Sequence, residues 1–293
     1  MPSLKEVRNK ITSVGSTMQI TSAMKMVSAA KLKRAQDAVV QMRPYANKLK
    51  EILANASASV DASDNVYARN NQVKNILIVA ISSNRGLAGA FNSNIIKKVN
   101  SLIQNEYSGL DVTVLPVGKK VQDAFRKTRY FITGQDLPHH NNELFDKLNY
   151  DNVAPVVEKI INVFVTGQFD KIVLVYNHFR NAAMQVPTEE QLLPMVAPQN
   201  DAKNARAVDY IFEPSQEFIV NELIPRSLKI QFYKALLDSV ASEHGARMTA
   251  MHKATDNAKA MQRELKITYN KARQASITKE ILEIVGGAEA LKG

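Results

Sequence analysis

The chain has 293 residues, a formal net charge of +10 and 45% hydrophobic residues, which is enough apolar content for a packed core. It contains no Cys, so disulfides, thiolate metal sites and cysteine nucleophiles are excluded. Its longest apolar runs, ILIVAI and KIVLV, are far shorter than the roughly 20 residues that cross a bilayer, and the N-terminus carries no signal or transit pattern. A cytoplasmic globular protein is predicted.

The positive charge is concentrated at the two ends of the chain. Residues 1–58 carry ten basic and three acidic side chains, and residues 241–293 carry nine basic and six acidic ones. Basic helices need an acidic partner or solvent around them. Nucleic acid, an acidic membrane surface and an acidic protein surface all match this charge.

A long N-terminal helix is predicted over residues 1–58. Apolar or small residues recur at alternating steps of three and four, which is the spacing of a coiled-coil seam. Between two runs of this seam, Met24, Met26, Val27 and Leu32 are expected to form a wider apolar front. The predicted seam consists of Leu4, Val7, Ile11, Val14, Met18, Thr21, Ala35, Val39, Met42, Ala46, Leu49, Leu53 and Ala56.

The middle of the chain has a different pattern. Residues 59–72 are polar and are interpreted as a linker. Residues 73–208 alternate β-rich runs with helical stretches, which predicts a Rossmann-like α/β domain with a parallel or mixed sheet. Strands are predicted at residues 76–82, 112–117, 130–133, 172–176 and 183–192, and helices at 90–107, 119–127 and 153–165.

A second long helix is predicted within residues 209–293, with Ser215 as its N-cap and Gly286-Gly287 as its stop signal. It also carries a three-four seam. Neither long helix has a neighbour in sequence to close its seam, so we expect the two to pair as an antiparallel coiled coil. The second seam is predicted at Leu237, Val240, His244, Arg247, Met251, Ala254, Ala258, Met261, Leu265, Thr268, Ala272, Ala275, Lys279 and Leu282.

Catalytic and cofactor motifs are largely missing. The sequence has no GxxxxGK[ST], and the glycines of SSNRGLAGAFN suit a tight strand-to-helix turn better than a nucleotide site. The cluster HHNNE, residues 139–143, could supply metal ligands but is interpreted as a solvated loop. The residues therefore favour an interaction protein over an enzyme, and no cofactor is expected. The segment TYNKARQASITKE reads as helix but has no broad apolar stripe to bury in a core.

Four stretches closely resemble the gamma subunit family of the F-type ATP synthase: KITSVGSTMQITSAMKMVSAAKLKRAQ, SSNRGLAGAFN, ASEHGARMTAMHKATDNA and YNKARQASITKEILEIVGGAEAL. The resemblance implies a non-catalytic central rotor shaft that couples proton flow to ATP synthesis. Its coiled-coil tip would turn in an apolar sleeve inside a ring of alpha and beta subunits, which explains a helix without a core face. The α/β domain would lie on the ring of c subunits beside epsilon, at the cytoplasmic face of a bacterial inner membrane, and would be held there only through partners.

The resemblance also implies contacts with the beta subunit. In many relatives the first loop has an acidic residue and a Cys where this chain has Asn84 and Ala88, which puts an ion-pair role for that loop in doubt. The beta-contact residues carried over are Met24, Lys25, Arg85, Arg247, Gln274 and Thr278.

Two rival hypotheses come from other classes of protein. A nucleic-acid-binding coiled coil would explain the basic N-terminal helix, but Tyr45 is the only aromatic residue there. A nucleotide-binding enzyme would explain the middle domain, but it leaves both long helices without a role. Neither rival accounts for YNKARQASITKE, so no nucleic acid is expected as a partner.

Overall fold

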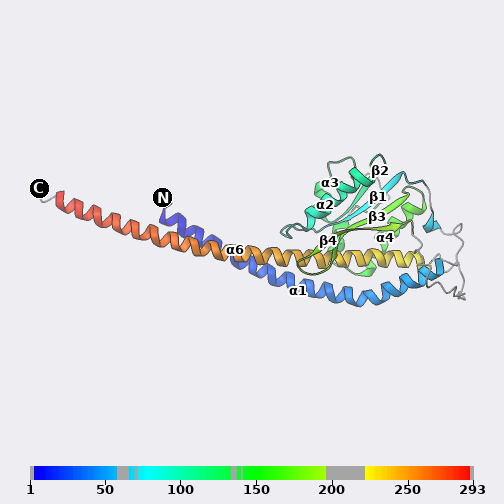
Figure 1. Ribbon diagram of the computed structural model, residues 1–293, viewed down its shortest axis with the longest axis horizontal. Coiled ribbons are helices and arrows are strands. Elements are labelled where there is room, and N and C mark those ends of the chain that lie inside the picture. The colour runs from blue at the N-terminus through cyan, green and yellow to red at the C-terminus, as the bar shows by residue number, and fades with distance from the viewer. Residues whose placement is uncertain are drawn as a thin grey trace. The chain divides into compact units, whose positions relative to one another are not determined.

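The computed structural model describes residues 3–57, 66–69, 72–132, 137–139, 141–195 and 222–290. The chain forms two compact units, Ala29–Ala246 and the pair of segments Met1–Ser28 and Arg247–Gly293. Two long helices, α1 (Leu4–Ser57) and α6 (Ile224–Ala290), contribute to both units (Figure 1). Several predictions concern positions outside the description: the side chains of Leu53 and Ala56, Thr133, His140, Ser215, and most of the predicted linker.

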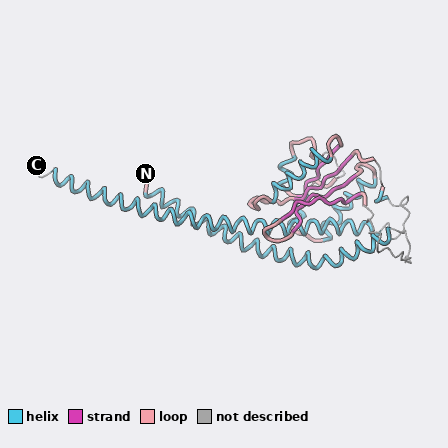
Figure 2. Tube along the Cα trace, in the orientation of Figure 1, coloured by secondary structure: helices cyan, strands magenta, loops and turns pink. Residues whose placement is uncertain are grey.

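A four-stranded mixed sheet forms the centre of the larger unit (Figure 2). Its order is β2-β1-β3-β4, with β1 parallel to β2 and to β3, and β4 antiparallel to β3. Strands β1 and β3 are apolar runs buried on both faces, as the inner strands of such a sheet require. The strands are β1 (Asn75–Ile81), β2 (Asp111–Val117), β3 (Lys171–Phe179) and β4 (Gln185–Leu193).

The prediction of a strand at residues 130–133 is wrong over its described part. Phe131 makes only an isolated bridge to Val114, beside the edge strand β2. The Phe131 N–H donates to the Thr128 carbonyl, so the chain is still in a turn after α3. Too few extended residues remain to form a second strand beside β2. The other four predicted strands are present.

Helices cover both faces of the sheet. On one face α2 and α3 bury Ile95, Val99 and Val121 against β1, β2 and β3. On the other face α4 and the first half of α6 pack Phe164 and Phe232 over the same strands. The helices are α2 (Phe91–Ser101), continued by a π-helical turn Leu102–Glu106, α3 (Lys119–Phe125) and α4 (Tyr150–Val165), with short 3-10 helices at Val66–Ala68 and Asn141–Phe145.

The described part of the predicted linker is docked on the α/β domain. The Tyr67 carbonyl accepts a 2.8 Å hydrogen bond from the Met195 N–H. Arg69 donates to the Phe164 carbonyl at 2.9 Å, and its guanidinium lies 5.2 Å from the Phe164 ring centroid. The chain that returns from α1 is therefore fixed to the end of α4 before it enters β1.

Asp170 connects the starts of β3 and β1. Its Oδ2 accepts hydrogen bonds from the backbone N–H groups of Asn75 and Lys74, each at 2.9 Å. These bonds, that from Asn75 foremost, lower the pKa of Asp170 below its ordinary value. Because the folded-state pKa is the lower one, the carboxylate stabilises the fold above its unfolded pKa, and this contribution is lost as the pH falls through the folded pKa.

We therefore expect Asp170→Asn to lower the melting temperature at neutral pH and to lose this effect in acid. The test compares the melting temperatures of the two chains from about pH 7 down to about pH 2, which brackets the ordinary Asp pKa of about 3.9. A gap that stays constant over this range would contradict the assigned role of the carboxylate.

The second long helix does not stop where the sequence predicted. It begins at Ile224, with Pro225 in the first turn where no backbone donor is needed, and it continues through Gly286 and Gly287 to Ala290. A helical glycine costs about 1 kcal/mol relative to Ala but does not by itself end a helix. The stop-signal prediction was wrong for this reason.

Gly286→Ala is expected to stabilise the end of α6, because a Cβ at this position meets nothing within 4 Å. The gain should be on the order of 0.5–1 kcal/mol. Slower amide hydrogen exchange over residues 283–290 would show it. Ala288→Gly is the matched reverse change and should speed the same exchange, whereas faster exchange in Gly286→Ala would mean that the helix does not continue here.

Candidate partner interface

In the smaller unit the start of α1 runs alongside the second half of α6 (Figure 1). Along the contacts given below, the residue numbers on α6 rise as those on α1 fall, so the two helices are antiparallel, as predicted. Three side-chain contacts fix this alignment. They join Lys25 Nζ to His252 Nδ1 (3.4 Å), Thr255 Oγ1 to Thr21 Oγ1 (2.8 Å), and the Arg8 guanidinium to the Tyr269 hydroxyl (2.7 Å).

The seam of this coiled coil is narrow and partly polar. Its buried residues include Val7, Thr21, Met251 and Ala258, so small and hydroxyl side chains alternate with a few large ones. Little apolar area is buried per turn, and the free energy that holds this pair together is correspondingly small. The unit is a slender shaft of two helices.

The wider apolar front that we predicted on α1 is wrong in part. Leu32 is buried and Met24 is half-buried, but Met26 and Val27 are 65% and 57% exposed. Because only one helix packs beside it, α1 buries a single narrow face. Met26 and Val27 lie on the face directed to solvent.

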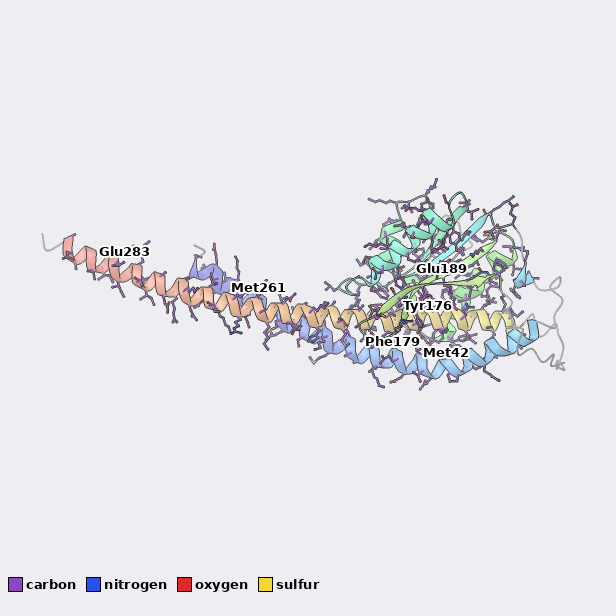
Figure 3. All side chains as sticks on the ribbon, in the orientation of Figure 1. Met42, Tyr176, Phe179, Glu189, Met261 and Glu283 are labelled. Atoms are coloured by element: carbon purple, nitrogen blue, oxygen red, sulfur yellow. The ribbon has the colours of Figure 1, made fainter. Side chains whose placement is uncertain are left out.

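Beyond Ala258, as far as residue 276, the predicted seam of α6 is confirmed at Leu265 and Ala272, which are half-buried. It is wrong at three positions, which are exposed: Met261, Thr268 and Ala275. Met261 is 53% exposed (Figure 3), whereas Gln262 is half-buried. The reason is local, because Gly15 of α1 has no side chain and the Gln262 amide nitrogen lies 3.0 Å from where a Cβ would be. At the three wrong positions the half-buried residue is the next one along the helix: Gln262, Tyr269 and Ser276.

Beyond the coiled coil, α6 continues alone. Arg8 pairs with Tyr269 near the beginning of α1, and every described residue from 277 to 290 is exposed. At about 1.5 Å per residue these 14 positions extend roughly 20 Å. Ile277, Ile281 and Ile284 share one side of this helix at helical spacing and are 49%, 54% and 71% exposed. Such a stripe needs a surface outside the chain.

The six predicted beta-contact residues fall into three places. Met24, Lys25 and Arg247 belong to the two-helix shaft; the first two are half-buried and Arg247 is 7% exposed. Gln274 and Thr278 are exposed on the outer part of α6, where the Thr278 hydroxyl donates to the Gln274 carbonyl at 2.9 Å. The 27 residues from Arg247 to Gln274 correspond to about 40 Å of helix, so these two groups are separate.

The sixth residue, Arg85, is exposed on the loop between β1 and α2 of the larger unit. The loop is held from within: the Ser83 N–H donates to Asn92 Oδ1 at 3.0 Å, and the Ser83 hydroxyl donates to the Arg85 carbonyl at 2.6 Å. Asn84 Nδ2 donates to the Asn142 carbonyl at 2.8 Å. The interpretation as a strand-to-helix turn agrees with this geometry.

Comparison with known proteins decides the family. A family model described as ATP synthase matches residues 3–291. The gamma chain of Flavobacterium johnsoniae is 57% identical, and that of Christiangramia forsetii 55% identical, each over the whole of both chains. The chain belongs to the ATP synthase gamma chain family. The resemblance and the rotor-shaft role predicted from the four sequence stretches are therefore confirmed.

Solved structures agree with this family. A chain of the mitochondrial ATP synthase central stalk and c-ring of Tetrahymena thermophila is 28% identical, with a TM-score of 0.57 over 80% of this chain and 99% of that one. A chain of the Euglena gracilis mitochondrial enzyme has a TM-score of 0.65 over 98% and 94% of the two chains at 22% identity, which supports the fold alone. The predicted fold, two long helices around an α/β domain, is confirmed.

Other sites considered for this gamma chain are not supported. No group of three or more His, Cys, Asp or Glu side chains that could hold a metal occurs among the described residues. The segment interpreted as a solvated loop is partly buried: Asn141 is 2% exposed, and its amide donates to the Pro138 and Pro116 carbonyls at 2.8 and 3.3 Å. Buried carbonyls need donors, and Asn141 supplies one.

No helix in the described part of this gamma chain has the length and apolar character to cross a bilayer.

Two features of the structure were missed from the sequence. The Arg8 guanidinium lies 5.6 Å from the Tyr269 ring centroid as well as bonding to its hydroxyl, and Leu87 is exposed at the tip of the Arg85 loop. The first is a long-range pair that spacing within one helix cannot reveal.

Proposed function

We propose that the tip of this rotor shaft is seated among the alpha and beta subunits of a proton-translocating F-type ATP synthase. The observation that carries the proposal is the end of α6, which leaves its partner helix and continues as a lone exposed helix with an apolar stripe. Exposure of a stripe of isoleucine side chains to water is energetically unfavourable, and an apolar sleeve would bury them.

The shaft acts through differential contact. Because its two helices and lone tip present different surfaces around the axis, each beta subunit meets a different face and is biased toward a different nucleotide affinity. Turning the shaft moves these biases from one beta subunit to the next. Bond formation in ATP stays on the beta subunits, and this chain supplies no catalytic residue.

We place the beta contacts at two levels of the shaft and on one loop. Met24, Lys25 and Arg247 form the first level, and Gln274 and Thr278 the outer one. A Lys ammonium donates several hydrogen bonds to carboxylates, so an acidic loop of beta suits the half-buried Lys25 at the first level. Arg85 would meet beta from the α/β domain.

We propose the remaining partners from the family to which the chain belongs. The α/β domain, assigned to residues 73–208 between the segments 1–58 and 209–293 that contain the two long helices, would bind epsilon and the ring of c subunits. The chain would lie at the cytoplasmic face of a bacterial inner membrane and be held there through these partners. The basic residues at its ends would then face acidic protein surfaces rather than nucleic acid.

The test is co-expression with the alpha and beta subunits of the same organism and purification through a tag on beta. The chain is expected to co-purify, and the ATP hydrolysis of the complex to depend on it, while the isolated chain hydrolyses no ATP. If the chain does not associate with them under conditions where alpha and beta assemble, the proposal is wrong.

A further inference from the structure

A row of four residues attaches one side of α6 to the edge of the sheet. We call it the contact row, and it consists of Gln231, Asp238, Ser242 and Gly245. Steps of seven, four and three residues place all four on the same side of a helix. The row lies within the larger unit, and each member contacts β3, β4 or the turn between these two strands.

The centre of the contact row is a buried carboxylate. Asp238 Oδ2 lies 2.9 Å from His178 Nδ1 near the end of β3, and the Asp238 side chain is 1% exposed. The His178 side chain is 39% exposed. If α6 turned about its own axis relative to β3, this bond would break inside the protein, where a carboxylate has little access to water. Breaking it there is far less favourable than sliding apolar side chains past one another.

Hydrogen bonds extend the contact row to both sides of Asp238. The Ser242 hydroxyl donates to the Asn177 carbonyl of β3 at 2.9 Å, and both residues are fully buried. In the other direction, Gln231 Nε2 donates to Glu190 Oε1 at 2.8 Å and to the Gln191 carbonyl at 3.2 Å, both on β4. One side of α6 is therefore bonded to two strands of the sheet.

Gly245 ends the contact row, where the turn between β3 and β4 meets the helix backbone. A Cβ at this position would lie 3.2 Å from Ala182 Cα and 3.4 Å from a ring carbon of Phe179, whose side chain is labelled in Figure 3. The turn is closed by two backbone bonds of 3.3 Å between Asn181 and Met184. The absence of a side chain at Gly245 lets this turn rest directly on α6.

We propose that the contact row, with Asp238 at its centre, fixes the rotational position of α6 in the α/β domain and so passes torque between the domain and the shaft. This inference rests on the proposed function, in which the domain binds the c subunits and the shaft turns among the beta subunits. Apolar packing is non-directional and by itself resists rotation of a helix weakly. Buried hydrogen bonds depend on angle and therefore oppose this rotation. Asp238 is a positioning residue for energy coupling.

The test compares proton pumping with ATP hydrolysis in inverted membrane vesicles that contain the whole synthase. Asp238→Ala should lower the number of protons pumped per ATP hydrolysed by at least roughly threefold. The complex of alpha, beta and the same variant chain, released from the membrane, should hydrolyse ATP at the wild-type rate, because the end of α6 is unchanged. A proportional loss of pumping and hydrolysis would mean that the substitution only destabilises the chain, and would overturn the inference.

Three further variants sharpen this test. Asp238→Asn keeps an acceptor for His178 and should retain most of the coupling. Glu158→Ala is the matched control, because it removes another contact of α6, 3.3 Å from Lys229 Nζ, but the Glu158 side chain is 60% exposed. It should leave the pumping ratio unchanged. Ser242→Ala removes a single hydroxyl from the contact row and decides the question if Asp238→Ala does not assemble; it should lower the ratio by a smaller factor.

Failure of this inference can be told apart from failure of the proposed function. If the wild-type chain does not assemble with alpha and beta, the proposed function is wrong. If the wild-type synthase pumps protons, but Asp238→Ala or, in its place, Ser242→Ala pumps as many per ATP, only the role of the contact row is refuted. An equal loss in Glu158→Ala would refute it too, since any contact of α6 would then serve.

Discussion

A chain that ends at Gln274 is expected to assemble with alpha and beta but to support ATP hydrolysis on the order of tenfold more slowly than the full chain. The truncation removes the apolar stripe of Ile277, Ile281 and Ile284 and leaves the two-helix part of the shaft intact, including the Arg8–Tyr269 pair. A tenfold loss corresponds to about 1.4 kcal/mol of lost tip contact in the rate-limiting state. Steady-state ATPase of purified complexes measures it.

The control for this truncation is a chain that ends at Ala290, which keeps the whole of α6. It should hydrolyse ATP at the full rate, so any loss is assigned to residues 275–290. If the chain ending at Gln274 were as active as the control, the exposed end of α6 would have no part in organising the beta subunits.

Gly118→Ala is expected to destabilise the larger unit by at least about 3 kcal/mol. Gly118 follows β2 with φ 113°, and an added Cβ would lie 2.6 Å from the carbonyl carbon of Ser82 and closer still to its oxygen. Both atoms are backbone, and Ser82 is fixed because its N–H donates to the Val117 carbonyl at 2.7 Å. Relief of the clash would separate the ends of β1 and β2. Denaturant unfolding of the full chain measures the loss.

Gly109→Ala is the matched control, because Gly109 also has a positive φ, 83°, but a Cβ there meets nothing within 4 Å. It should cost only about 1 kcal/mol, the strain of the left-handed conformation alone. Equal losses at the two positions would mean that the contact with Ser82 does not matter. The Gly118 N–H also donates to Asn142 Oδ1, and Asn142 accepts from Asn84 of the Arg85 loop, so Gly118→Ala should weaken the support of that loop as well.

Much of this architecture can be predicted from the sequence. Four strands and the helices between them follow from apolar runs separated by amphipathic stretches, since each buries residues close to it in sequence. The pairing of α1 with α6 follows because each has a seam that nothing nearby can close. Val7, Thr21, Met251 and Ala258 lie in the seams as predicted.

Several of the failures share a physical cause, a contact that the sequence pattern of one segment does not show. Met261 is displaced from the seam because Gly15, far away in sequence, leaves room for Gln262. Asn141 is buried because carbonyls of β2 and its own segment need a donor there. Leu87 has a left-handed backbone conformation, with φ 62°, and no pattern within SSNRGLAGAFN indicates it. The beta contacts need the partner itself.

The central claim, that the chain turns inside a ring of alpha and beta subunits, is tested most directly by watching it turn. Because the chain contains no Cys, Lys127→Cys on the exposed turn after α3 gives a single attachment point for a bead. With beta immobilised through its tag and ATP supplied, the bead is expected to rotate in one direction, in steps that repeat with the symmetry of the ring. A complex that hydrolyses ATP while the bead stays fixed relative to beta would contradict the account.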